Sequence, residues 1–242
     1  MTPGRDPDFV IVGAQRCGTT SLLAALRDDP GAGSIPTDEL HFFDFQYELG
    51  LDWYRSHFSG PGLVGESSPY YLFHPLAPRR FGSDLVETLA ICVLRDPIER
   101  AFSQWQWNRR RGREPLDFLE ALDAEPARLV GEHERMLTGD TGRGKPHQDW
   151  SYVARGDYRP QVECWREACG HDRVLVVDAH ALFVGDRVAQ ARVLGFLDLD
   201  TAGLPPRHLN ASTDTLPDDL RARAAGRFTY DPSGFRDLCS AE

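Results

Sequence analysis

Lysine is almost absent from this chain, because Lys145 is the only one among 27 lysine and arginine residues. The 242 residues carry a formal net charge of −10. A nucleic-acid partner is therefore disfavoured, since domains that bind nucleic acids generally present a surplus of positive charge. The scarcity of lysine also makes arginine the expected cation wherever a related site would use lysine.

Long apolar runs and metal-binding cysteine patterns are also missing. No stretch approaches the roughly 20 apolar residues that a membrane-spanning helix needs. The first residues, MTPGRDPD, contain no basic region followed by an apolar segment. We therefore expect a cytoplasmic protein without a membrane partner. The five cysteines are odd in number and show no metal-ligand spacing, which predicts free thiols in a reducing compartment: Cys17, Cys92, Cys164, Cys169 and Cys239.

The length and the 41% hydrophobic content favour one α/β domain over residues 1–242, with its core at roughly 8–200. Apolar runs typical of strands alternate with helical patterns, and this alternation predicts a parallel sheet with helices on both faces. Strands are expected at 9–12, 63–66, 89–94 and 174–177, and helices at 19–27, from 97 onward and at 181–196.

The stretch 123–150 differs from the rest of the chain. It contains four glycines, two prolines and many charges, and it is too long for a simple connector. We expect it to be irregular. Two interpretations stay open, a mobile lid on the substrate side or an insertion without a role in the site.

The most informative motif is GAQRCGTTSL, which begins at Gly13 directly after the first expected strand. Gly13 and Gly18 occupy the two glycine positions of the phosphate loop G-x-x-x-x-G-K-[ST], and Thr20 occupies its Ser/Thr position. The lysine that grips the outer phosphates of a nucleoside triphosphate is replaced by Thr19. The motif therefore predicts a site for a single phosphate-like group and argues against ATP or GTP hydrolysis.

The physics of such a loop favours an anion. The first N–H groups of the following helix have no partner within the helix, and its dipole presents a positive end. Hydroxyl groups add donors, and the guanidinium of Arg16 can bond two oxygens at once. A strand–turn–helix junction with incidental glycines is the alternative, which the complete GxxxxGTTS context disfavours. The predicted phosphate-binding residues are Arg16, Cys17, Gly18, Thr19, Thr20 and Ser21.

A second motif, VLRDPIERAFS, follows the most apolar run of the chain. Asp96 is expected to cap a helix in which Pro97 takes the first position and Glu99 lies three residues past the cap. Arg95 stands at the carboxyl end of a buried strand, where open α/β sheets bind ligands. Together with Ser103, two turns into the helix, it can hold a second anion. For Arg95 taken alone, an ion pair with a neighbouring carboxylate is the alternative.

Together with ELHFFD at 39–44 and GESSPYYL at 65–72, these motifs resemble the PAPS-dependent sulfotransferases, of the carbohydrate type related to heparan sulfate sulfotransferases and their bacterial relatives. The stretch ARGDYRPQVECW is also similar. The resemblance implies a P-loop-like three-layer α/β fold, with a central parallel sheet flanked by helices. It also implies binding of 3′-phosphoadenosine 5′-phosphosulfate (PAPS) without a metal. The loop would hold the 5′-phosphosulfate, while Arg95 and Ser103 would hold the 3′-phosphate.

The chain departs from the family pattern at several positions. Arg16 stands where the family usually has lysine, and Ser67 stands where it often has another lysine. The eukaryotic carbohydrate enzymes carry a late Lys-Gly cofactor segment, and this chain has PPRHLNAS instead, in which Arg207 or Asn210 is the substitute. The resemblance therefore carries over neither the late cofactor contacts nor a polyanionic glycan as the acceptor.

The transfer of a sulfuryl group to a hydroxyl requires a base within hydrogen-bond reach. The resemblance implies Glu39 for this role, from its match to the glutamate of the family's E-x-H-F-F motif. His41 is the second choice, because an ordinary histidine pKa suits neutral pH. Arg16 and the loop N–H groups would stabilise the charge on the departing phosphate. Without the motif, Glu39 would be read as a solvated carboxylate and His41 as a histidine at the edge of the core.

We therefore expect a PAPS-dependent O-sulfotransferase that acts on a hydroxyl of a small molecule or saccharide, of open identity, in an assembly of open oligomeric state. Two alternatives remain. A P-loop small-molecule kinase predicts a loop lysine and a magnesium-binding carboxylate, and Thr19 counts against it. A non-catalytic nucleotide-binding module would bind the product nucleotide, 3′-phosphoadenosine 5′-phosphate (PAP), and would have no use for a base at Glu39.

Overall fold

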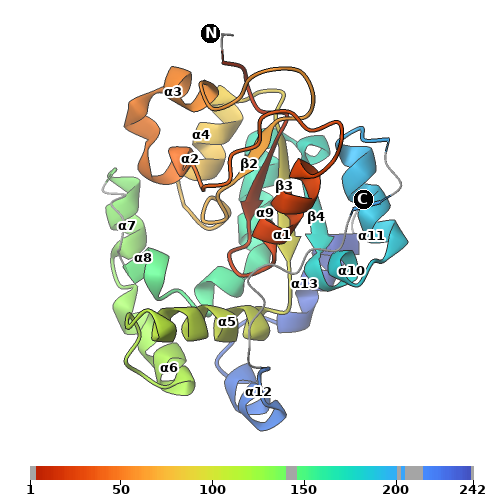
Figure 1. The fold of residues 1–242 in the computed structure, drawn as a ribbon. Coiled ribbons are helices and arrows are strands. Elements are labelled where there is room, and N and C mark those ends of the chain that lie inside the picture. The colour runs from red at the N-terminus through yellow and green to blue at the C-terminus, as the bar shows by residue number, and fades with distance from the viewer. Residues whose placement is uncertain (1–3, 140–145, 201–202, 205–214, 241–242) are drawn as a thin grey trace.

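The computed structural model describes residues 4–139, 146–200, 203–204 and 215–240 (Figure 1). At its centre lies a parallel sheet of four strands in the order β2-β1-β3-β4. The strands are almost entirely buried, as expected of a parallel sheet covered on both faces. They are β1 (Phe9–Gly13), β2 (Gly65–Ser67), β3 (Leu89–Leu94) and β4 (Val174–Asp178).

Helices surround this sheet, with α1 in front of it and α9 behind it in the view of Figure 1. The helices of the first half are α1 (Thr19–Arg27), α2 (Phe42–Phe45), α3 (Leu51–Arg55), α4 (Ala77–Asp84), α5 (Pro97–Arg110) and α6 (Phe118–Arg128). Those of the second half are α7 (Glu132–Leu137), α8 (Pro146–Asp149), α9 (Tyr158–Cys169), α10 (Ala179–Phe183), α11 (Arg187–Phe196), α12 (Asp218–Ala225) and α13 (Phe235–Ser240). Short 3₁₀ turns precede α9 at Ala154–Gly156 and β4 at His171–Arg173.

The predicted three-layer α/β fold is confirmed. The main core lies between the sheet and its helices and includes the fully buried Phe9, Phe81 and Trp165. A second apolar cluster lies below it, where Phe102 of α5 packs on Phe118 of α6 with ring centroids 5.2 Å apart. The helix cap predicted before α5 is also present, since the Asp96 carboxylate accepts the backbone N–H of residue 99 at 2.9 Å.

One predicted helix is in fact two. The expected helix at 181–196 breaks between α10 and α11, at Gly185, whose φ of 83° lies in the left-handed region. Asp186 then caps α11 by accepting the N–H groups of Val188 and Ala189, each at 2.9 Å. Glycine tolerates this conformation and aspartate favours a cap, so the Gly-Asp pair is the signal that continuous apolar periodicity concealed.

The expectation that 123–150 is irregular is wrong for the residues that the structure describes. They continue α6 and then form α7 and α8. A capping box between Asp117 and Glu120 starts α6 upstream of the stretch, and Gly131, at a φ of 74°, separates α6 from α7. Met136 and His147 are buried, so tertiary packing stabilises helices that the composition did not suggest. Residues 140–145 lie outside the described part.

The close contact between Gly18 and Phe183 predicts that the phosphate loop tolerates only glycine at this position. The φ of Gly18 is 86°, and a Cβ at this position would lie 2.3 Å from Cε2 of Phe183. We predict that Gly18→Ala lowers the free energy of unfolding by more than about 1 kcal/mol, the cost of backbone strain alone. Gly195→Ala, at an open position inside α11, should instead raise it by roughly 0.5–1 kcal/mol. Urea unfolding of both variants checks this. Equal effects of the two substitutions would contradict the packing described.

Candidate functional site

The loop after β1 runs directly beside the end of β3. The N–H of Ala14 donates to the carbonyl oxygen of Val93 at 2.8 Å and so continues the pairing of the two strands beyond Gly13. A Cβ on Gly13 would lie 2.4 Å from Cβ of Leu72, so only glycine fits there. Arg95, the first residue after β3, donates from Nη1 to the carbonyl oxygen of Arg16 at 3.3 Å. The two predicted anion sites are therefore neighbours.

The predicted loop residues differ in what they can present to a ligand. Cys17, Thr19 and Ser21 are buried, whereas Thr20 is exposed. Gly18 stands at the N-cap of α1, and its carbonyl oxygen accepts the N–H of Ser21 at 2.9 Å. The N–H groups of Thr19 and Thr20 are therefore the ones without an acceptor within the helix. An anion at the loop would therefore meet backbone N–H groups and the Thr20 hydroxyl, rather than the side chains of the buried residues.

A cluster of arginines meets at this junction. Arg16 donates from Nε to the Ser103 hydroxyl at 3.1 Å, which joins the loop to α5. Burial and the positive charges of Arg110 and Arg95 lower the pKa of Arg16. Arg110 lies seven residues after Ser103 and hence on the same face of α5. It belongs to the basic run at 108–113, for which the sequence left open a solvated helix end or attraction of an anionic ligand, and it was not among the predicted site residues. Neighbouring positive charges favour an anion between them. The structure therefore brings the predicted residues Arg16, Arg95 and Ser103 together, with Arg110 beside them.

Arg95 also makes the ion pair that was considered as its alternative role. Its Nη2 lies 2.7 Å from Glu99, and the other oxygen of Glu99 accepts from Arg221 of α12 at 2.6 Å. Arg221 also bonds Asp96 at 3.0 Å. The network fixes the orientation of Arg95 and brings the C-terminal part of the chain onto the site. Arg207, the predicted late contact, lies outside the described residues.

The segment before α2 holds a histidine between two carboxylates. The Nε2 of His41 lies 2.9 Å from Glu39, and its Nδ1 lies 2.7 Å from Asp44. Burial by itself lowers the pKa of His41, but its hydrogen bonds to Asp44 and Glu39 outweigh burial and raise the pKa to about 9. The ordinary pKa that made His41 the second choice as the base is therefore absent. His41 is an imidazolium at neutral pH and orients Glu39, whose side chain is 47% exposed.

Residues after β2 anchor this segment. The Ser68 hydroxyl accepts the backbone N–H of His41 at 3.0 Å and donates to Glu66 at 2.7 Å. The Tyr71 hydroxyl accepts the N–H of Phe42 at 2.6 Å. Burial raises the pKa of Glu66 to about 7. The GESSPYYL motif thus positions the ELHFFD motif, a role that spacing alone did not reveal for Glu66, Ser68 and Tyr71.

Two residues of the ARGDYRP stretch bond the phosphate loop and the residue that follows β3. Arg155 is fully buried and bonds the side chain of Gln15 in the phosphate loop. Burial lowers its pKa to about 10, so it stays charged at neutral pH. The Tyr158 hydroxyl donates to the carbonyl oxygen of Arg95 at 3.1 Å and lies 3.7 Å from the thiol of Cys17. Sequence reasoning noted this stretch but assigned no role to either residue.

None of the helices in the described part of the chain combines the length and the apolar content that a membrane span requires. In the same residues, no group of three or more histidine, cysteine, aspartate or glutamate side chains is arranged to hold a metal ion.

No protein-family model matches the chain. Heparan sulfate glucosamine 3-O-sulfotransferase 6 of Homo sapiens is 31% identical over 202 residues, which cover 81% of this chain and 54% of that protein. Membrane-associated sulfotransferase kil1 of Dictyostelium discoideum is 32% identical over 135 residues, 51% of this chain and 29% of that protein. The chain therefore spans only part of the length of these curated relatives.

A solved structure covers the whole fold. The sulfotransferase from Alicyclobacillus acidocaldarius has a TM-score of 0.74 and 27% identity, over 98% of this chain and 97% of that one. The likeness thus extends across the sheet, the phosphate loop and the helices that surround them.

Glu39 and Asp44, which bond the two ring nitrogens of His41, form what we call the His41 clamp. This clamp predicts that the free energy of unfolding depends on pH. Because the pKa of His41 is raised to about 9 in the folded state, its contribution to the free energy of unfolding is complete below its ordinary pKa near 6.5 and is lost as the pH rises through 9. We predict that His41→Asn is destabilised at pH 6 and that the difference from the parent shrinks by up to about 3 kcal/mol by pH 10. Urea unfolding across this range measures it.

The exposed His180 of α10 provides the matched control for this experiment. His180→Asn measures how the loss of a histidine outside the clamp changes the free energy of unfolding with pH. A destabilisation by His41→Asn that stays constant from pH 6 to pH 10 would contradict the charged clamp.

Proposed function

The chain belongs to the sulfotransferases, and we propose that it is a PAPS-dependent O-sulfotransferase that transfers a sulfuryl group to a hydroxyl of a small molecule or saccharide. One observation carries this proposal. A phosphate loop without its lysine is joined through Arg16 to a second anion site at Ser103 and Arg95. A nucleotide with phosphate groups on both sides of its ribose, as in PAPS, matches that arrangement.

The residues fit this co-substrate, which supplies an activated sulfuryl group. We assign the 5′-phosphosulfate to the N–H groups at the start of α1 and to Thr20, and the 3′-phosphate to Arg95 and Ser103. Arg16, now bonded to Ser103, would turn to the bridging phosphate oxygen when the nucleotide binds and stabilise the charge that develops there. The two phosphates would also relieve the repulsion among the clustered arginines.

The base in this proposal is Glu39. Asp44 is fully buried and holds His41, and His41 in turn holds the Glu39 carboxylate at 2.9 Å. Glu39 remains open to solvent on its other side and can accept the proton of an acceptor hydroxyl. His41 is a positioning residue in this account, because its own charge keeps it from accepting a proton at neutral pH.

A partly exposed aromatic ring lies beside the proposed base. The half-buried ring of Phe45 lies 5.1 Å from that of His41 and stacks on the buried Tyr70 at 5.5 Å. Such a ring suits a sugar or another partly apolar acceptor, and we propose one of these. The relative named above acts on heparan sulfate glucosamine, according to its name. All five cysteines are free thiols, which supports our further proposal that the protein works in a reducing cytoplasm.

Nucleotide preference is the first test. We predict that PAP stabilises the protein without added metal, by about 2.7 kcal/mol at 100 times its dissociation constant, because it binds the folded state alone. Thermal unfolding with PAP, with Mg-ATP and with neither gives the measurement. A shift with Mg-ATP and none with PAP would favour the kinase alternative.

The role of Glu39 is the second test. We predict that Glu39→Gln retains PAP affinity but lowers turnover of an aliphatic alcohol by roughly 10²–10⁴, the usual contribution of a positioned base. With an acidic phenol the loss should be smaller, because less assistance is needed to remove its proton. Steady-state rates with both acceptors check this.

A neighbouring exposed glutamate serves as the control. Glu48→Gln, in the turn after α2, should turn over like the parent. Full activity of Glu39→Gln on the alcohol would refute the assignment of the base. PAP binding without turnover of any acceptor, in parent and variants alike, would instead support the non-catalytic module.

A further inference from the structure

The phosphate loop contains one side-chain amide that the proposed function leaves unassigned, that of Gln15. Its oxygen Oε1 accepts a hydrogen bond from Nη1 of Arg155. Because a guanidinium carries donors only, the atom that faces Arg155 must be the amide oxygen, and the contact fixes which way the amide is turned. The amide nitrogen of Gln15 has no hydrogen-bond partner among the described residues. Since the side chain is only half-buried, its two N–H groups are available to a ligand.

Arg155 is a buried cation that makes no ion pair with a carboxylate in the described part of the chain. Its Nη2 donates to the carbonyl oxygens of His147 and Gln148, at 3.0 and 2.7 Å. Burial, and then the positive charge of the buried Arg100, lower the pKa of Arg155. Neutral partners hold the guanidinium in place but do not compensate its charge, and a buried charge without compensation is costly.

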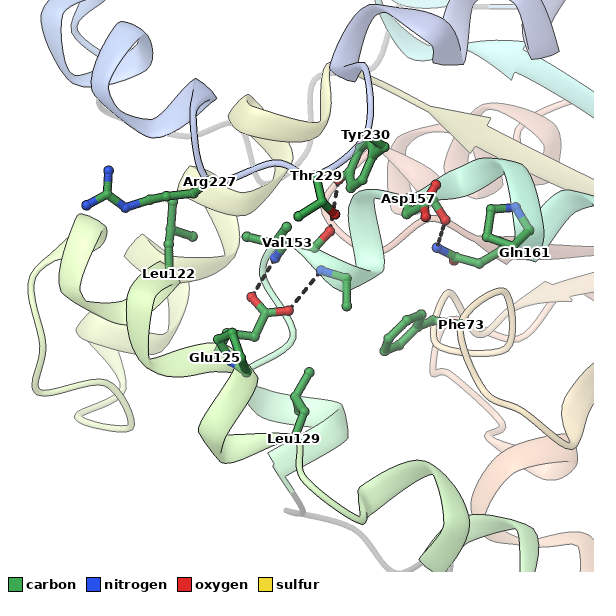
Figure 2. Close-up of a pocket in the computed structure, with 13 residues that line it drawn as sticks. Phe73, Leu122, Glu125, Leu129, Val153, Asp157, Gln161, Arg227, Thr229 and Tyr230 are labelled. Atoms are coloured by element: carbon green, nitrogen blue, oxygen red, sulfur yellow. Dashed lines mark hydrogen bonds between the residues drawn. The ribbon is translucent and has the colours of Figure 1, made fainter.

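Two carboxylates act on Arg155 through space, those of Glu125 and Asp149, but both are bonded to other groups. Figure 2 shows that Glu125 accepts the backbone N–H groups at 153–154, at 2.6 and 2.8 Å. Asp149 lies 3.4 Å from Arg113. The positive charge behind the phosphate loop is therefore left for a bound anion to compensate.

The contacts of Arg155 also lead from the loop to the acceptor side. Its guanidinium carbon lies 5.1 Å from the ring centre of Tyr70 and 5.2 Å from that of Phe73. Tyr70 in turn stacks on Phe45, the ring beside the proposed base. Gln15 is thus joined through the chain to the start of α1 and through Arg155 to the acceptor side. In the proposed reaction the sulfuryl group moves between these two parts of the site.

We propose that the Gln15 amide donates to the oxygens of the sulfuryl group of PAPS and orients this group for transfer, with Arg155 as the positioning residue that fixes the amide. The inference rests on the proposed function, because it assigns a residue to the co-substrate named there. Sulfuryl oxygens only accept hydrogen bonds and share a negative charge, which complements both the free N–H groups of Gln15 and the charge of Arg155. The 5′-phosphate stays at the start of α1. PAP lacks the sulfuryl group, so Gln15 distinguishes the co-substrate from the product.

Calorimetric titration of the full chain with PAPS and with PAP, in the absence of an acceptor, tests this role. Gln15→Met keeps the length of the side chain and removes its donors. We expect it to bind PAPS about tenfold more weakly, the usual contribution of a hydrogen bond to a charged group, and PAP like the parent. Gln190→Met, the same change at a half-buried position of α11, is the matched control and should bind both nucleotides like the parent.

Arg155→Lys tests the positioning role, because lysine keeps the charge but not the planar set of donors that holds the amide. We expect this variant to lose preference for PAPS over PAP. Combined with Gln15→Met it should lose nothing further, since Arg155 acts through Gln15. A role in the fold alone would weaken both nucleotides equally, and the losses would add. Thermal unfolding shows whether each variant is folded, and Gln15→Met decides the inference if Arg155→Lys is not.

Two outcomes separate this inference from the proposed function. If the parent binds both nucleotides and Gln15→Met loses affinity for both equally, or for neither, the role of Gln15 is refuted and the proposed function stands. A parent that binds neither PAPS nor PAP would overturn the proposed function and this inference together.

Discussion

The pairing of β1 with β3 is the constraint on which the site depends. Phe9 pairs with Leu89 and Ile11 with Ile91, and the register then shifts so that Gly13 lies opposite Cys92. The extra residue in β1 carries the chain out of the sheet into the phosphate loop beside Val93, two residues before Arg95. A loop that left the sheet at another register could not bring Arg16 to the Ser103 hydroxyl.

The strand β2, which lies beside β1, also ends at the site. In the order β2-β1-β3, the carboxyl ends of three adjacent strands carry the three parts of the site. The residues after β2 anchor Glu39 and His41 through Ser68, β1 leads to the phosphate loop, and β3 leads to Arg95. Ligands of open α/β sheets bind at this edge. The proposed base, the loop and the arginines of the proposed 3′-phosphate site are thus held together by backbone pairing rather than by surface contacts.

Local signals were sufficient for much of this arrangement. The apolar run before Gly13 and the glycine spacing predicted the first strand and the loop that follows it, because each depends on residues close in sequence. The buried run before Arg95 likewise predicted that this arginine follows a strand. The break at Gly185 was hidden by apolar periodicity that continues on both sides of it. The helices within 123–150 depend on tertiary burial, which a composition rich in glycine and charge conceals.

Long-range contacts were beyond such reasoning. Arg155 bonds Gln15 across 140 residues of sequence, and only the fold brings them together. The charge of His41 is a similar case. Its carboxylate neighbours at positions 39 and 44 are visible in the sequence, but the clamp requires the left-handed backbone of His41, whose φ is 51°. Without that turn the histidine would keep an ordinary pKa, and its assignment as a base would have been reasonable.

The central claim is that Arg95 holds a 3′-phosphate beside a loop that holds a 5′-phosphate. Calorimetric titration of the parent and of Arg95→Ala with PAP and with adenosine 5′-phosphate tests it most directly. A charge-assisted hydrogen bond contributes about 1.5–3 kcal/mol, so Arg95→Ala should bind PAP ten- to a hundredfold more weakly and adenosine 5′-phosphate almost unchanged. An equal loss for both nucleotides, or no loss for PAP in a folded variant, would contradict the account.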